Sequence, residues 1–357
     1  MPKAALPYLP VPGALFAIAK PSGPPCMPML DGIKPLINQS RLFNDPAGIE
    51  VSKQAVKKRR FKHRPGGVKI GQGGTLDPLA DGVLIMGIGK ATKLLQTHLD
   101  GPKTYRATAL LGAETDSYDS EGRVVRTAPW KHVTRQQIEG VLDRFRGDIA
   151  QLPPIYSALK MDGKPLYWYA REGKKLPRPI EPRKVTVFSL ECIDWQEGAP
   201  IEGEGDGHHF NFPANRVPDQ DKETMKAVRQ LIVGEGNVPG VAGELLSEAG
   251  DLPEVEEQGR PPTFKVEMRV SGGTYVRSLI HDIGHAVGSA AHVVTLSRIQ
   301  QGEYHCEEQP GDPGNCVPWS VFQKAIEEHH AGGTLPAASG EWVEWEEAIL
   351  DKMKMVE

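Results

Sequence analysis

The sequence Gly71-Gln72-Gly73-Gly74-Thr75-Leu76-Asp77-Pro78-Leu79-Ala80-Asp81-Gly82 is rich in turn-forming residues and runs into the apolar stretch 83–86. Glycines let a backbone take positive φ and approach a ligand closely, and Pro78 fixes the chain directly after Asp77. We therefore predict that a stiff loop presents the Asp77 carboxylate, which makes Asp77 the candidate reactive group. An ordinary turn with a helix-capping Asp uses the same residue types, so both interpretations stay open here. The Gly-x-x-x-x-Gly-Lys-[Ser/Thr] pattern of a phosphate-binding loop is absent.

Composition indicates a globular protein. The chain has 357 residues with 39% hydrophobic content, enough for one large domain or two ordinary ones. It has no run of about 18 apolar residues and no secretory signal, so we expect neither a membrane span nor secretion. Its four cysteines form no Cys-x-x-Cys pair, which argues against a zinc ribbon and favours free thiols in a reducing compartment. Cys306 and Cys316 are close enough in sequence to bridge if oxidised.

Charge is distributed unevenly along the chain, although the net charge is only −4. Acidic residues crowd into 197–260, whereas 51–69 is strongly basic and includes Lys58, Arg59 and Arg60. This basic run fits a solvated face, a nuclear localisation signal or a phosphate-binding patch. We favour the patch, because it directly precedes the Asp77 loop and RNA binding needs a charged surface. A signal and a patch can coexist in the same residues.

Hydrophobic periodicity predicts alternating strands and helices. Thr134 and Gln137 form a capping box, and strict alternation makes 264–270 the clearest strand. In 103–110, Tyr105, Ala107 and Ala109 share one strand face. The predicted strands are 15–19, 103–110, 183–195 and 264–270, and the predicted helices are 33–43, 91–99, 134–146, 276–287, 319–330 and 341–355.

Three motifs carry a family resemblance. The stretch from Gly73 to Leu84, followed by Gly87-Ile88-Gly89-Lys90-Ala91-Thr92-Lys93, resembles the catalytic motif of the TruB family of pseudouridine synthases, in its eukaryotic, fungal-like form. Lys103-x-Tyr105 and Gly273-Thr274-Tyr275-Val276-Arg277-Ser278-Leu279 resemble two further motifs. The resemblance covers roughly 13–196 and 263–304, and 292–299 is similar to the family's closing strand. It implies an α+β pseudouridine synthase fold, with a mixed, largely antiparallel sheet, flanking helices and a central catalytic cleft.

The resemblance also assigns roles to individual residues. Asp77 becomes the essential aspartate, Arg277 its partner, and Tyr105 the ring that stacks on a flipped base. Gln72 stands where many relatives have a histidine; it can still form hydrogen bonds but cannot titrate. For Tyr156 and Lys160, an architectural role and a nucleotide contact are equally open. The residues expected to contact substrate or RNA are Gln72, Lys20, Tyr156, Lys160, Tyr275, Leu296, Lys58, Arg59 and Arg60.

The implied activity is isomerisation of uridine to pseudouridine in the T loop of tRNA, at position 55, and at mRNA sites that mimic this loop. The reaction needs no cofactor and no metal. His281 and His285 are spaced i, i+4 on a predicted helix and suit zinc, but no Glu follows His281, so we expect no metal site. The expected partner is the T arm of tRNA, with no membrane, and the expected state is a monomer.

Two other classes of function compete with this enzyme. One is a non-catalytic tRNA-binding or tRNA-folding factor on the same scaffold, and the other is a subunit of a guide-RNA-directed particle. The latter would be expected to carry a β-type C-terminal module. We expect an N-terminal extension (1–12), a catalytic domain (13–305) with an acidic, flexible insertion (197–262), and a helical tail (306–357) without that module. Nuclear, mitochondrial and cytoplasmic locations are all compatible with the sequence.

Overall fold

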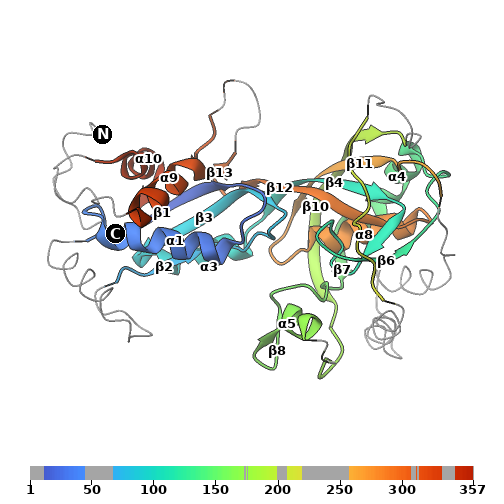
Figure 1. Cartoon of the computed structure of the whole chain (residues 1–357), viewed down its shortest axis with the longest axis horizontal. Coiled ribbons are helices and arrows are strands. Elements are labelled where there is room, and N and C mark those ends of the chain that lie inside the picture. Colours follow the sequence, from blue (N-terminus) through green and yellow to red (C-terminus); the bar gives the residue numbers. More distant parts are fainter. Residues whose placement is uncertain are drawn as a thin grey trace. The chain divides into compact units, whose positions relative to one another are not determined.

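The structure is a computed structural model that describes residues 12–44, 67–172, 174, 176–198, 207–218, 257–306, 311, 313–331 and 342–356 (Figure 1). The chain divides into two compact units. The first unit combines Met1–Gly101 with Arg298–Glu357, and the second unit is Pro102–Ser297. The basic run with Lys58, Arg59 and Arg60 lies outside the described residues.

The first unit is built on a mixed sheet. Its two long strands, β1 and β3, pair antiparallel over their full length, from Gly13 opposite Gly89 to Lys20 opposite Gly82. β14 joins β1 in parallel, whereas β15 joins β1 and β2 joins β3 in antiparallel orientation. The strands are β1 (Gly13–Lys20), β2 (Ile70–Gln72), β3 (Asp81–Gly89), β14 (Cys316–Pro318) and β15 (Lys354–Met355).

Both faces of this sheet are covered, which explains why β1 is buried on both sides. On one face, Leu15, Ala17 and Ile85 pack against Leu95 and Tyr304. On the other face, Phe16 stacks on Phe322 of α9, with ring centroids 6.2 Å apart. The surrounding helices are α1 (Cys26–Gln39), η2 (Lys90–Lys93), α3 (Leu95–Asp100), α9 (Trp319–His330) and α10 (Glu344–Lys352).

The second unit contains an antiparallel sheet in the order β4-β11-β10-β7. Along β4, buried residues alternate with half-buried ones, so Tyr105, Ala107 and Ala109 share the buried face as predicted. Tyr105 is paired with Met268 of β11. The strands are β4 (Lys103–Leu111), β7 (Gly147–Gln151), β10 (Arg183–Gln196) and β11 (Thr263–Val270).

Helix α8 (Val276–Ala286) supplies much of the core of the second unit, because Leu279, Ile280 and Ile283 are all fully buried. Helix α4 (Arg135–Val141) begins at the predicted capping box of Thr134 and is followed by η3 (Leu142–Phe145). Two hairpins complete the unit. They are β5 (Ala113–Thr115) with β6 (Val124–Thr127), and β8 (Lys160–Met161) with β9 (Lys164–Pro165), the latter followed by α5 (Leu166–Arg171).

Strand β12 (Ala291–Gln301) contains the point in the sequence where the second unit ends. Residues 291–297 belong to the second unit, and residues 298–301 belong to the first. It continues through a tight turn into β13 (Tyr304–His305), with which it pairs. The strand predicted at 292–299 is confirmed, and so is a mixed, mostly antiparallel sheet with helices.

Several details differ from the sequence-based expectations. Helix α1 starts at Cys26 instead of Ile33, because a proline in the first helical turn is tolerated. The C-terminal segment has its two predicted helices but also contributes β14 and β15. Part of the insertion is anchored, since the main chains of Val124 and Val217 are hydrogen-bonded. All four cysteines are thiols, as expected. In the described part of the chain, no helix has the length and apolarity to cross a membrane.

Candidate active site

The loop that carries Asp77, residues 73–80, is clamped by Lys20. The Lys20 side chain is almost fully buried, and its Nζ donates to Ala80 O at 2.6 Å and to Pro78 O at 3.2 Å. The neighbouring turn adds a bond from Gly23 N to Pro78 O, 2.8 Å long. An ammonium group buried among carbonyls fixes their positions, because each lost bond would leave a buried polar group unsatisfied. The Lys20-Pro21 turn therefore holds the two ends of the tight turn that follows Asp77.

Two buried polar side chains hold the other end of this loop. Arg298 is 1% exposed; its Nε donates to Val83 O at 2.7 Å and its Nη2 donates to Gly74 O at 2.9 Å. Gln301 Nε2 donates to Gly73 O at 2.6 Å. Gly82 allows the close approach, because its φ is +102° and a Cβ there would lie 2.3 Å from Arg298 O. The loop is thus fixed at both ends, with Asp77 only partly exposed.

Gln72 sits at the end of β2, just before the Asp77 loop. Its Nε2 donates to Thr75 Oγ1 at 2.9 Å, which ties the side chain to the loop. Its Oε1 is buried and has no hydrogen-bond partner among the described residues. An amide oxygen is an acceptor with two lone pairs, so this buried atom lacks the hydrogen bond that such a group usually accepts.

Arg277, the second residue of α8, is anchored within the second unit. Its side chain is 5% exposed, and Asp119 Oδ2 lies 3.6 Å from Nη1. The guanidinium also donates to Ser117 O and, at 2.9 Å, to Tyr156 O. A planar guanidinium with several fixed acceptors keeps one orientation, so Arg277 is a rigid positive group. Asp77 belongs to the first unit, and its pairing with Arg277 stays a prediction.

Tyr156 is the predicted site residue that the structure brings to Arg277, through its main-chain carbonyl. Its side chain is half-buried. Burial raises the pKa of its phenol, and the neighbouring Asp116 carboxylate raises it further. The phenol therefore stays protonated at neutral pH and is able to donate a hydrogen bond.

The remaining predicted residues of the second unit occupy different settings. Tyr105 is 9% exposed on β4, and Leu296 is 5% exposed on β12. Tyr275 precedes α8, and its main-chain N–H and C=O both bond to the Gln151 amide, at 2.8 and 2.9 Å. Lys160, in contrast, is exposed on β8. Tyr156, as described above, accepts a hydrogen bond from Arg277 through its main-chain carbonyl.

Sequence reasoning overlooked several residues that position the site. Gln151, Gln301 and Ser117 all fix functional segments through hydrogen bonds, yet none shows a periodicity or motif signal of its own. Lys20 was expected near substrate, and the structure gives it a loop-holding role instead of an exposed charge. Asp119, two residues after Ser117, faces Arg277.

Replacing Lys20 tests the clamp. Lys20→Met keeps the length of the side chain but removes the ammonium, so we expect the free energy of unfolding to fall by about 1–3 kcal/mol. A displacement of the loop by roughly 1 Å is expected to lower the rate of a reaction at Asp77 by about 100-fold. Chemical denaturation and single-turnover assays measure the two effects.

Ser22→Ala is the matched control for this clamp. The exposed Ser22 hydroxyl makes one bond to the same turn, to Leu79 O at 2.7 Å. We expect its loss to change stability by less than about 0.5 kcal/mol. Wild-type stability and turnover in Lys20→Met would show that the ammonium does not hold the loop.

Comparison with known proteins shows that the sequence of this chain matches one family. The family described as "TruB family pseudouridylate synthase (N terminal domain)" matches residues 58–204. The tRNA pseudouridine synthase 4 of Schizosaccharomyces pombe is 37% identical over 87% of this chain and 82% of that protein. That of Saccharomyces cerevisiae is 36% identical over 82% and 78%. The human pseudouridylate synthase TRUB1 is 30% identical over 90% of this chain and 70% of that protein.

Solved structures add little to this comparison. A Cbf5-Nop10-Gar1 complex aligns with a TM-score of 0.47 and 20% identity over 96% of this chain and 60% of that chain, a likeness too weak to support a functional conclusion. The sequence matches are sufficient to define the class of protein, which is a pseudouridylate synthase. The chain belongs to the TruB family, and its similarity to the fungal and human proteins places it in the eukaryotic branch.

Proposed function

We propose that this chain isomerises uridine to pseudouridine in the T loop of tRNA, at position 55, with Asp77 as the reactive group. The observation that carries the proposal is the Asp77 loop, whose two ends are fixed by buried Lys20 and Arg298. The naming of the fungal relatives as tRNA pseudouridine synthases supports the choice of RNA. T-loop-like mRNA sites are proposed as further substrates of the same site.

The reaction breaks the bond between uracil N1 and ribose C1′, turns the base, and joins C5 to C1′; C5 loses its proton and N1 gains one, with no change of oxidation state. An ionised carboxylate serves either as a nucleophile or as a base toward the sugar. We propose that the Arg277 guanidinium is the partner of the Asp77 carboxylate, because guanidinium and carboxylate groups form strong, oriented hydrogen bonds. The anchoring of Arg277 by Ser117 and Tyr156 supports a fixed positive group of this kind.

The uridine must leave its stack to react, which costs a few kcal/mol. We propose that the ring of Tyr105 receives the flipped base, since stacking on an aromatic ring offsets part of this cost. Gln72 Oε1, buried and without a partner among the described residues, is proposed to accept a hydrogen bond from the RNA. An amide in place of the family histidine supports hydrogen bonding but no proton transfer at this position.

Substitution of Tyr105 separates stacking from hydroxyl chemistry. Tyr105→Phe keeps the aromatic ring and therefore the stacking energy, which is roughly 1–3 kcal/mol per base. We therefore expect the Kd for tRNA to change by less than about threefold. If the hydroxyl moves a proton, turnover falls by about 10²-fold or more. Filter binding and single-turnover assays report the two quantities. Unchanged turnover in Tyr105→Phe would restrict Tyr105 to a stacking platform.

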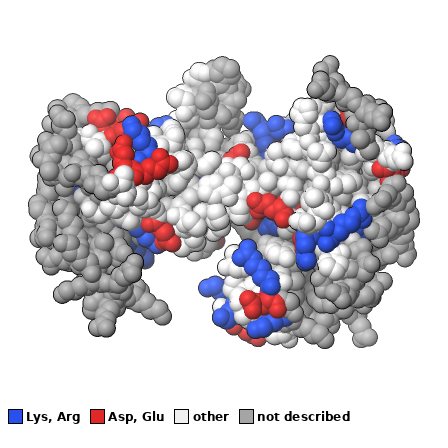
Figure 2. Space-filling model, viewed as in Figure 1, with Lys and Arg blue, Asp and Glu red and all other residues white. Residues whose placement is uncertain are grey.

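The surface of the β8–α5 region supports an RNA partner. Figure 2 shows Lys and Arg side chains gathered around this part of the molecule, with a smaller acidic group among them. Lys164 and Lys174 lie over the ring of Trp168, at 5.1 and 4.4 Å from its centroid. Exposed cations that neutralise phosphates supply affinity that weakens with salt. We propose that these cations, with Lys160, contact the RNA backbone, and that Lys58, Arg59 and Arg60 do the same.

A non-catalytic tRNA-binding factor is the second candidate. The replacement of the family histidine by Gln72 favours it, whereas the presence of Asp77, Tyr105 and Arg277 favours the enzyme. We also propose that the protein is a monomer and that it is located in the nucleus or the mitochondrion. The basic run in 51–69 motivates the nuclear location.

Incubation with an unmodified tRNA transcript tests the proposal. Pseudouridine is expected at the T-loop uridine, and a transcript in which cytidine replaces this uridine is the matched control that receives none. A minihelix of the T arm alone should also be modified if the T arm is the element recognised. Tight binding without pseudouridine in any transcript would favour the non-catalytic factor. Pseudouridine at another position would leave the enzyme class intact and overturn the T-loop assignment.

A further inference from the structure

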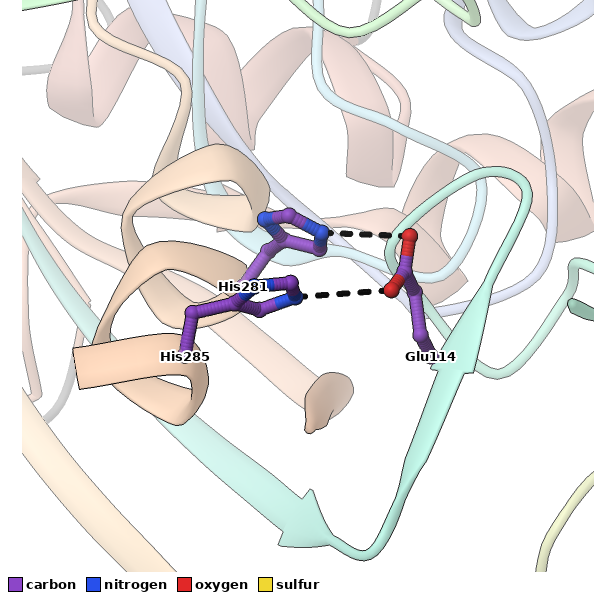
Figure 3. Close-up of side chains that lie close together, drawn as sticks. All are labelled: Glu114, His281 and His285. Carbon is purple, nitrogen blue, oxygen red and sulfur yellow. Dashed lines mark ion pairs between the residues drawn. The ribbon is translucent and has the colours of Figure 1, made fainter. Parts of the chain in front are cut away.

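Three buried side chains of the second unit converge on one another, from elements far apart in the sequence (Figure 3). Glu114 comes from β5, and His281 and His285 come from consecutive turns of α8. His281 Nε2 lies 3.3 Å from Glu114 Oε1, and His285 Nε2 lies 3.4 Å from Glu114 Oε2. All three side chains are at most 5% exposed. This Glu-His-His cluster has the donor atoms of a zinc site.

The spacing of these atoms fits ligands that surround one ion. Zn–N bonds of 2.0–2.1 Å in tetrahedral geometry separate neighbouring ligand atoms by about 3.3 Å. The two nitrogen-to-oxygen distances in the cluster are 3.3 and 3.4 Å, and all three donor atoms lie within 4.8 Å of one another. Both distances exceed the usual 2.7–3.2 Å of an N–H···O hydrogen bond. Each histidine Nε2 faces its own oxygen of Glu114, so the spacing is compatible with one shared ion as well as with two long hydrogen bonds.

Surrounding groups orient the imidazole rings. His281 Nδ1 lies 3.0 Å from Asp282 Oδ1, which directs Nε2 toward Glu114. A carboxylate on the other ring nitrogen is the usual partner of a metal-binding histidine. The ring of His281 packs between those of Tyr118 and His285, with centroids 4.0 and 4.3 Å away. Because the rings are held on several sides, little side-chain entropy remains to be lost on binding an ion.

Arg126 occupies the remaining side of the cluster. It lies opposite Glu114 across the β5–β6 hairpin, and its Nε is 2.8 Å from Glu114 Oε2. Its Nη2 is 3.1 Å from His285 Nε2. A guanidinium only donates, so this His285 nitrogen carries a lone pair, as a metal ligand must. The Arg126 side chain is 14% exposed and reaches the surface, which leaves it a route outward.

We propose that Glu114, His281 and His285 form a Zn²⁺ site, in which the ion replaces the Arg126 guanidinium as the counter-charge of Glu114. Mixed imidazole and carboxylate ligands suit zinc. The ion would tie α8 to the β5–β6 hairpin, and α8 is the helix that begins at Val276, next to Arg277. With three protein ligands, a water molecule would complete a four-coordinate shell. The ion would stabilise the fold here, and the site is independent of the RNA reaction proposed above.

Zinc binding by the full-length protein, stripped of metal with a chelator, tests this proposal. Isothermal titration with Zn²⁺ alone is expected to show one tight site, and the melting temperature should rise with free Zn²⁺. Glu114→Gln and His285→Gln are expected to weaken binding by more than about 100-fold, because loss of an outer-shell partner alone costs 10–100-fold. Asp282→Asn alters the outer-shell partner of His281 and is expected to weaken Zn²⁺ binding by about 10–100-fold.

Arg126→Gln separates a metal site from a buried ion pair. Removing the competing guanidinium is expected to raise the affinity for Zn²⁺ several-fold, since a positive charge beside the ion opposes binding. If the cluster were only a buried ion pair, Arg126→Gln would lower the stability of the protein without raising its affinity for Zn²⁺. His132→Gln is the matched control, because this histidine also lies in the second unit but contacts Val287 O, at 3.0 Å.

Co²⁺ provides a readout that does not depend on a variant's folding. Wild-type protein is expected to give the intense visible absorption of a four-coordinate site with one equivalent of Co²⁺, and circular dichroism verifies the fold of each variant. If Glu114→Gln or His285→Gln does not fold, Arg126→Gln and the Co²⁺ spectrum decide. Absence of stoichiometric binding, or unchanged binding in the folded Glu114→Gln and His285→Gln variants, would overturn the proposal.

Discussion

Asp77→Asn is expected to remove pseudouridine formation, with turnover lowered by at least about 10⁴-fold in single-turnover assays on tRNA. The amide has nearly the shape of the carboxylate but lacks the charge and the nucleophilic oxygen. Asp77 is partly exposed, and its carbonyl accepts from Ala80 N at 3.1 Å, a main-chain bond that the substitution keeps. We therefore expect the Kd for tRNA and the free energy of unfolding to remain close to wild type.

Asp81→Asn is the matched control for Asp77→Asn. Asp81 is also partly exposed and opens β3, four residues after Asp77. A general loss of negative charge at this loop would affect both variants alike, whereas a specific chemical role affects Asp77 alone. Turnover of Asp77→Asn within tenfold of wild type, or equal losses in both variants, would exclude Asp77 as the reactive group.

Arg277→Lys is expected to have the second largest effect on turnover, a loss of about 10²–10³-fold, comparable to removal of one preorganised donor from an active site. Lysine keeps the positive charge but cannot reach Ser117 O and Tyr156 O at once, as the guanidinium does. The position of the charge is lost while its sign is retained. We expect the Kd for tRNA to change by less than about threefold, because phosphate contacts elsewhere dominate affinity.

Arg277→Ala is expected to lower turnover in the same direction and to cost a further 3–5 kcal/mol or so in stability, since it leaves the buried Asp119 carboxylate without this partner. Lysine is therefore the cleaner test. Asp119→Asn serves as a comparison, because it weakens the anchoring of Arg277 without altering the guanidinium. Comparable losses in turnover and in tRNA affinity for Arg277→Lys would contradict a role in the chemical step.

Elements with strong local signals were predictable from the sequence. The capping box at Thr134, the alternation along β11 and the apolar stripe of α8 are all encoded within a few residues, and each is present in the structure. Strands β14 and β15 were missed, because segments of two or three residues become strands only by pairing with β1. Such pairing depends on residues that are distant in sequence.

For the candidate site, the sequence suggests residues but not their surroundings. The motifs identified Asp77, Tyr105 and Arg277 as candidates, but not the contacts that hold them. Lys20 and Arg298 reach the Asp77 loop from strands that are distant in sequence, and their targets are main-chain carbonyls, which carry no residue signature. His281 and His285 were not expected to bind metal because no Glu follows His281; in the structure the carboxylate of Glu114 faces this pair from β5.

The pairing of β1 with β14 and β15 has a consequence for synthesis of the protein. β1 lies near the start of the sequence and these two partners near its end, whereas the second unit is a single continuous segment. On the ribosome, the intervening unit emerges and can fold before the partners of β1 exist. Until then the apolar surface of β1 lacks part of its cover and is exposed to chaperones and proteases. Deletion of β15 would therefore leave this part of β1 without its cover, whereas the second unit would keep all of its own strands.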